Sequence, residues 1–114
     1  MLAQIYSLKG EGTIKEILKK GQKQQSDNFG AFFVNRNNNE LPRFAFVISK
    51  KISKFAVHRN RVKRAMSESV RRNVKLIPRG IEFVFLAKKS IIEKTTDEIM
   101  REVQNFFTKL NFDD

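Results

Sequence analysis

Residues 49–73 read SKKISKFAVHRNRVKRAMSESVRRN, a run of lysines and arginines with a single acid, Glu68. Placed on a helix at about 100° per residue, the small and apolar side chains gather on one arc: Val62, Ala65, Met66, Ser69 and Val70. The opposite arc carries Asn60, Arg61, Arg64 and Arg71, and the border carries Arg59 and Lys63. The pattern predicts a helix from about residue 56 to 74 that packs one side on a core and offers the other to a polyanion.

Apolar runs on both sides of this helix predict strands. Residues 43–49 and 81–87 are apolar on both faces, apart from their ends and Glu82, which is typical of buried strands. Residues 29–34 also have apolar side chains on both faces, and they predict another strand. The strand–helix–strand order implies that 43–49 and 81–87 pair in parallel. The polar loop between 29–34 and 43–49 predicts that these two form an antiparallel hairpin.

Two further helices are predicted near the ends of the chain. Thr13 and Glu16 have the spacing of a capping box before a short apolar stripe, and Gly21 is a plausible stop, so we expect a helix over 13–20. Thr95 and Glu98 repeat that spacing before an amphipathic pattern that ends near residue 110. Residues 22–28 read as a polar connection. The prediction is one α+β domain over 1–114, in the order helix, strand, strand, helix, strand, helix.

The composition of the 114-residue chain narrows the class of partner. Its formal net charge of +11 makes nucleic acid the first candidate and an anionic membrane surface the second. The N-terminus lacks the pattern of a signal peptide, and no apolar run approaches the roughly 20 residues of a membrane span. The absence of cysteine excludes disulfides and thiolate chemistry, and fits a cytoplasmic protein.

The basic helix could simply be a solvated face, as most charge runs are. Two features favour an RNA partner instead. First, acids are scarce on the helix, so few of its cations can form ion pairs within it. Second, most of the cations are arginines, and the forked guanidinium group matches the geometry of phosphate oxygens. Among the aromatic residues, Phe32, Phe44 and Phe46 are candidates to stack on unpaired bases, and Phe32 is favoured because it lies beside the polar turn.

The sequence offers no catalytic or metal-ligating constellation. His58 is the one histidine, and no carboxylate in register is there to orient it, so it reads as a surface or RNA-facing residue. No metalloprotease motif and no glycine-rich phosphate loop is found. We therefore expect the polypeptide to take part in cleavage only through a catalyst from elsewhere.

Two motifs carry a family resemblance. FVISKK at 46–51 and AVHRNRVKR at 56–64 closely resemble the signature of the bacterial ribonuclease P protein subunit, and FVFLAKK at 83–89 resembles the last strand of that family. The resemblance extends from about residue 8 to 110. It implies a ferredoxin-like, two-layer sandwich shared with a ribosomal protein domain, with a possible extra short strand and a left-handed βαβ crossover.

The resemblance also implies a function. The protein would be a cytoplasmic subunit that binds a catalytic RNA as a monomer, one to one, away from any membrane. Together they would remove the 5′ leader of precursor tRNA endonucleolytically, with Mg²⁺ held mainly by the RNA. The alternative is a ribosomal-type structural RNA-binding protein, which would not stimulate cleavage.

Matched to this sequence, the resemblance assigns roles to particular residues. The RNA-binding set would be Lys50, Lys51, Lys54, Arg59, Asn60, Arg61, Lys63, Arg64 and Arg71. The cleft for the 5′ leader would be walled by Ile14, Leu18 and Phe32. Ile14 and Leu18 stand where the family often has phenylalanine, and Ser67 where many members have arginine, so we expect weaker stacking and one cation fewer.

Overall fold

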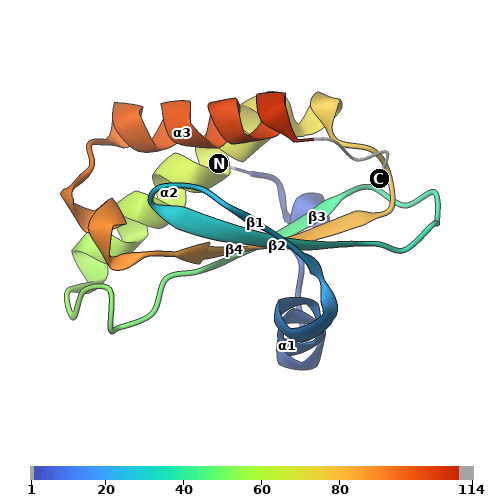
Figure 1. The fold of residues 1–114 in the computed structure, drawn as a ribbon, viewed down its shortest axis with the longest axis horizontal. Helices are drawn as coiled ribbons and strands as arrows, with labels where there is room; N and C mark the ends of the chain where they lie inside the picture. The colour runs from blue at the N-terminus through green and yellow to red at the C-terminus, as the bar shows by residue number, and fades with distance from the viewer. Residues whose placement is uncertain (1, 111–114) are drawn as a thin grey trace.

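The computed structural model describes residues 2–110 as a four-stranded sheet with helices on both faces (Figure 1). The helices are α1 (Glu11–Lys20), α2 (Ala56–Asn73) and α3 (Thr96–Lys109), with short 3-10 turns η1 (Gln4–Tyr6), η2 (Val74–Leu76) and η3 (Lys89–Glu93). The strands are β1 (Gln22–Gln25), β2 (Phe29–Asn35), β3 (Arg43–Val47) and β4 (Ile81–Ala87). The predicted α+β class is confirmed.

The strands lie in the order β1-β2-β4-β3. β3 and β4 pair in parallel, as the strand–helix–strand order predicts, with Phe44 opposite Phe83. The predicted hairpin between β2 and β3 is wrong, because β4 lies between them and pairs antiparallel with β2. A polar loop leaves a chain free to turn back, and it does not specify which strand becomes the neighbour.

β1 is the extra short strand that the family resemblance made possible. It pairs antiparallel with β2, Gln22 opposite Phe33 and Gln25 opposite Gly30. The predicted connection over 22–28 is therefore wrong for residues 22–25 and confirmed for residues 26–28. All four β1 side chains are exposed, so backbone hydrogen bonds to β2 hold the strand, and no apolar alternation marks it in the sequence.

The main core lies between the sheet and the layer formed by α2 and α3 (Figure 1). Phenylalanines from β2, β3, β4 and α3 fill it, with Phe83 and Phe85 fully buried. The rings of Phe44 and Phe83 lie 5.7 Å apart in a stacked arrangement. α3 begins with the predicted capping box, since Glu98 N–H donates to Thr95 Oγ1 and Thr95 N–H donates to the Glu98 carboxylate. The Thr95 backbone N–H accordingly lowers the pKa of Glu98.

α1 covers the opposite face of the sheet (Figure 1) and forms a second, smaller core around Ile17 and Val84. Its predicted capping box is wrong, because the helix begins at Glu11, with Gly10 as a cap that offers no side chain. Gly21 does follow the last residue. A Cβ there would lie 2.6 Å from the carbonyl oxygen of Ile17, so only glycine lets the chain turn directly into β1.

A salt-bridge network fixes α1 to the sheet. The Arg36 guanidinium, just after β2, donates to Glu16 of α1 at 2.6 Å and to Glu82 of β4 at 2.9 Å. The hydrogen bond from Arg36 lowers the pKa of Glu16. The wall that α1 contributes to the outer face of the sheet is thereby held in a set position.

Candidate RNA interface

α2 has an inner face and an outer face, as its sequence predicts. The five residues of the predicted apolar arc are all buried: Val62, Ala65, Met66, Ser69 and Val70. Ser69 Oγ donates to the Met100 carbonyl at 2.8 Å, which joins α2 to α3. Because the inner face packs on α3 and the sheet, α2 is held as a rigid support for the side chains on its outer face.

The cationic surface, as we name it, consists of exposed side chains before and along the first half of α2: Lys50, Lys51, Lys54, Asn60, Lys63 and Arg64. No acid occurs between residues 49 and 67, so none of these cations has an acidic partner within the segment. Arg59 lies at the edge of this surface, half-buried, and one of its terminal nitrogens donates to the Ser53 carbonyl at 2.7 Å. This hydrogen bond ties the preceding loop to the helix.

Arg61 differs from its neighbours although it was predicted to face the polyanion with them. Its side chain is half-buried, and its two terminal nitrogens donate to the carbonyls of Ile92 and Lys94, each at 2.9 Å. These carbonyls belong to η3 and the link into α3. Its part in RNA binding stays a prediction, and the structure shows it fastening α2 to another segment of the protein.

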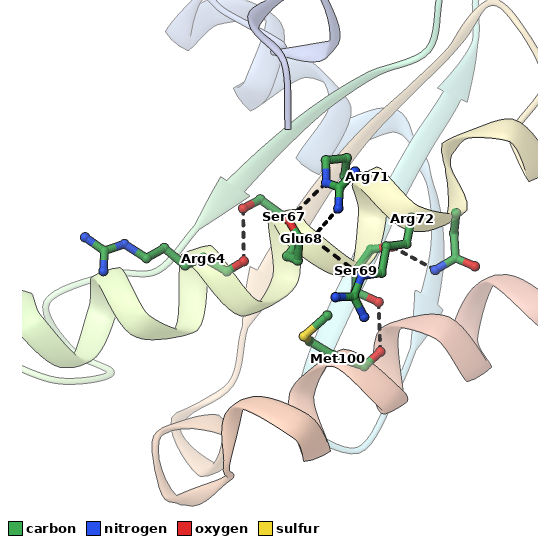
Figure 2. A network of polar contacts seen from close by, with 8 residues as sticks. Arg64, Ser67, Glu68, Ser69, Arg71, Arg72 and Met100 are labelled. Carbon is green, nitrogen blue, oxygen red and sulfur yellow. Dashed lines mark hydrogen bonds and ion pairs between the residues drawn. The ribbon is translucent and has the colours of Figure 1, made fainter. Parts of the chain in front are cut away.

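Arg71 lies in the second half of α2 and forms an ion pair. Its Nε donates to the Glu68 carboxylate at 3.0 Å, a second nitrogen donates to the other oxygen, and Arg72 lies 3.5 Å from the same group (Figure 2). The hydrogen bond from Arg71 lowers the pKa of Glu68. Figure 2 also shows the Arg64 guanidinium pointing away from this network. Arg71 is therefore exposed but engaged, whereas Arg64 is exposed and available.

A cleft of about 600 Å³ lies beside β3, the edge strand, between the N-terminal segment and α2. The apolar part of the lining includes Ile14 of α1 and Phe46 of β3, which pack against the clusters on opposite faces of the sheet. α2 contributes Asn60, Lys63, Arg64 and Ser67. The cleft thus brings together one predicted leader-cleft residue and three predicted RNA contacts. An apolar wall opposite cations suits a chain that offers both bases and phosphates.

The other two predicted leader-cleft residues, Leu18 and Phe32, lie beside Ile14 in the apolar cluster under α1, not in the lining of the cleft. Phe32 is half-buried, and the Lys23 ammonium lies 5.7 Å from its ring centroid. The structure therefore groups all three on the outer face of the sheet, with Ile14 bridging to the cleft.

Two other sequence candidates for stacking differ in exposure. Phe44 and Phe46 both line the cleft, but Phe44 is only 2% exposed and packs in the main core, whereas Phe46 is half-buried. His58 is exposed, and its contacts are the Ser53 hydroxyl at 3.5 Å and the ring of Phe55. Within residues 2–110, no group of three or more histidine, cysteine or acidic residues could hold a metal ion. In the same range, no helix has the length and apolar character to cross a bilayer.

Sequence reasoning missed one exposed residue at this interface. Phe55 immediately precedes α2 and is 54% exposed, the one exposed phenylalanine within residues 2–110. Periodicity could not find it, because a single aromatic residue in a basic loop fits no helical or strand pattern. Its aromatic character in a run rich in cations was the available signal.

The fold and this surface define a small basic α+β protein with a cation-bordered cleft. The model of the family described as Ribonuclease P matches residues 2–111. The ribonuclease P protein component of Fusobacterium nucleatum is 34% identical over 98 residues, which cover 86% of each chain. That of Clostridium kluyveri is 33% identical over 107 residues, or 92% of this chain and 94% of the relative.

Solved structures agree in fold. The Staphylococcus aureus RNase P protein superposes with a TM-score of 0.82 at 24% identity, covering 90% of this chain and 93% of the other. The Thermotoga maritima RNase P protein gives 0.79 at 24% identity, covering 92% and 97%. The chain belongs to the ribonuclease P protein family and is a protein subunit of that RNA-processing endoribonuclease. The ribosomal-type alternative is thereby set aside.

Proposed function

We propose that the protein binds the catalytic RNA of ribonuclease P through the cationic surface and receives the 5′ leader of precursor tRNA in the cleft at β3. One observation carries the proposal: exposed, unpaired cations of α2 border an apolar cleft wall. Phosphates would approach Lys63 and Arg64 while unstacked bases meet the wall that Ile14 and Phe46 provide. The partnership would be one monomer with one catalytic RNA, in the cytoplasm.

The protein's contribution would be electrostatic positioning. Where leader and catalytic RNA approach each other, their phosphates repel, and the cations of α2 reduce that repulsion. Mg²⁺ held mainly by the RNA would supply the metal chemistry when bound. The described residues of the protein do not fit a metal site of their own, so no step is assigned to a protein-held ion.

Reconstitution with the catalytic RNA and precursor tRNA tests the proposal. Wild-type protein should stimulate cleavage at one 5′ site. Lys63→Ala with Arg64→Ala should reduce stimulation more at low Mg²⁺ than at high Mg²⁺, because added Mg²⁺ also screens phosphates. Arg101→Ala with Lys109→Ala is the matched control, since it removes the same charge from exposed positions on α3.

Three results would count against positioning. The first is an equal loss at both Mg²⁺ concentrations, and the second is an equal loss in the control pair. The third is cleavage by RNA-free, highly purified protein, which would indicate a self-contained nuclease.

A further inference from the structure

The exposed ring of Phe55 is not used by the fold. The other phenylalanines of residues 2–110 are buried or half-buried, and together they fill the two cores. Single exposed apolar residues are common on protein surfaces, so exposure alone implies nothing. What distinguishes Phe55 is how firmly it is held and what surrounds it.

The backbone around Phe55 is fixed by four hydrogen bonds. Its N–H donates to Ser53 Oγ at 3.2 Å, and its carbonyl accepts from the N–H groups of His58 and Arg59 at 3.2 and 3.3 Å. The Arg59 side chain donates to the Ser53 carbonyl at 2.7 Å. A ring on so constrained a backbone loses little conformational entropy when a ligand binds it.

The surroundings of the ring are cationic and aromatic. The Lys54 ammonium lies 5.2 Å from the ring centroid, and the His58 imidazole approaches edge-on with centroids 5.5 Å apart. Lys50 and Lys51, in the loop that precedes Phe55, are also exposed, and no acid occurs between residues 49 and 67. An aromatic face among cations is the combination that binds single-stranded nucleic acid, where a base stacks and its phosphates are neutralised.

A membrane is the other polyanion that could meet this patch. Within residues 50–60, Phe55 and Val57 are the only large apolar side chains that are exposed. The apolar arc of α2 that would have to insert into lipid is buried against the core instead. RNA is therefore favoured.

We propose that an unpaired base of the catalytic RNA stacks on Phe55 while Lys54 contacts an adjacent phosphate. The inference rests on the proposed function and adds a contact outside the leader cleft. Phe55 does not line that cleft, and at a helical rise of about 1.5 Å per residue it lies about 7.5 Å along the axis from Asn60, the cleft residue of α2 nearest to it in sequence. The catalytic RNA, rather than the leader, is therefore the partner.

The chain contains no tryptophan, so Phe55→Trp introduces a single tryptophan, which can be excited selectively and which keeps the stacking face. Its emission should be quenched when the catalytic RNA is added. Leu76→Trp is the matched control, because Leu76 is 62% exposed and lies beyond the other end of α2, and its emission should not change. Equal responses at both positions, or no quenching at saturating RNA, would overturn the inference.

Affinity measurements separate stacking from simple apolar contact. Phe55→Ala should weaken binding to the catalytic RNA by about 5- to 100-fold, as the loss of one stacked base does. Phe55→Tyr should bind like wild type, and Phe55→Leu should bind like Phe55→Ala. Full affinity in Phe55→Ala or Phe55→Leu contradicts stacking.

Two arms identify the partner. Precursor tRNA alone, or vesicles of phosphatidylglycerol and phosphatidylcholine, should leave the Phe55→Trp emission unchanged. A response to either that matches or exceeds the response to catalytic RNA would overturn the assignment. If wild-type protein does not bind the catalytic RNA, the proposed function fails. If it binds and Phe55→Ala binds equally, only the present inference fails.

Discussion

In the first half of α2, residues 56–64, the exposed Lys63 and Arg64 form no ion pair within residues 2–110, whereas in the second half, residues 65–73, Arg71 and Arg72 both contact Glu68. Both halves are rich in basic side chains and both pack their inner faces on the same core. One acid makes the difference. Availability to phosphate therefore depends on local pairing, and the number of arginines on a helix does not measure it.

Arg61 gives the same lesson within the first half. Arg61 lies between Asn60 and Arg64 in sequence. The side chains of Asn60 and Arg64 line the cleft, whereas the Arg61 guanidinium donates to backbone carbonyls. The first half of α2 thus contains both a fastener and available cations. Variants can separate these roles because they alter stability and RNA affinity differently.

The largest effect is expected from the support that both halves share. Met66 is fully buried between α2 and its neighbours, so Met66→Ala should lower the free energy of unfolding by about 2–5 kcal/mol. Met100→Ala, at a half-buried position on α3, should cost less. Urea denaturation of both variants measures the difference, and a smaller loss for Met66 would show that the inner face of α2 is not the rigid support inferred here.

Next in size is the loss of the Arg61 fastener. Arg61→Ala leaves the carbonyls of Ile92 and Lys94 without these donors, and should cost about 1–3 kcal/mol of stability. Arg61→Lys should also destabilise, because one ammonium cannot reproduce the two-pronged geometry although the charge is kept.

Arg64→Ala is the comparison for Arg61. We expect its stability to stay within about 0.5 kcal/mol of wild type, because its side chain is exposed, and its RNA affinity to fall. If Arg61→Ala kept full stability and lost RNA affinity as Arg64→Ala does, Arg61 would be a direct RNA contact.

The smallest effect should come from releasing the second half. Glu68→Gln removes the acid that holds Arg71 and Arg72, so RNA affinity should rise by a few-fold at most, as expected for an exposed ion pair. Filter binding at low salt measures it. Unchanged or reduced affinity would indicate that this half of α2 lies outside the RNA-binding surface.

The ion pair between Glu68 and Arg71 also predicts how stability depends on pH. The folded-state pKa of Glu68 is lowered below its ordinary value, so its contribution to stability is present above the unfolded pKa. That contribution is lost progressively as the pH falls from the unfolded pKa through the lowered pKa, which lies at about 2. Acid titration of wild type against Glu68→Gln should therefore show curves that converge at the acid end, whereas parallel curves would argue against the ion pair.

Local pattern predicted the parts of the fold that local physics determines. The basic helix, predicted over 56–74, runs from Ala56 to Asn73, and its predicted inner arc is buried, since burial imposes the helical period on the sequence. The Thr95 capping box is also confirmed, because its two hydrogen bonds join residues that are only three apart in sequence. The Thr13 box is wrong because that helix begins at Glu11, two residues before Thr13, with Gly10 as its cap.

The parts that could not be predicted depend on distant partners. β1 has four exposed polar residues and owes its existence to β2, and the insertion of β4 between β2 and β3 depends on pairing across the chain. At the site, Arg61 resembles any RNA-facing arginine until its acceptors, 31 and 33 residues away, are known. The exposure of Phe55 likewise follows from the finished fold.

The salt dependence of binding to the catalytic RNA tests the central comparison most directly. Each phosphate contact that is lost should reduce the slope of log affinity against log salt by about 0.7 to 0.9. Lys63→Ala with Arg64→Ala should therefore flatten the slope by about 1.4 to 1.8, while Arg71→Ala with Arg72→Ala should leave it nearly unchanged. Equal flattening by the two pairs would contradict the account, because both halves of α2 would then be meeting phosphate alike.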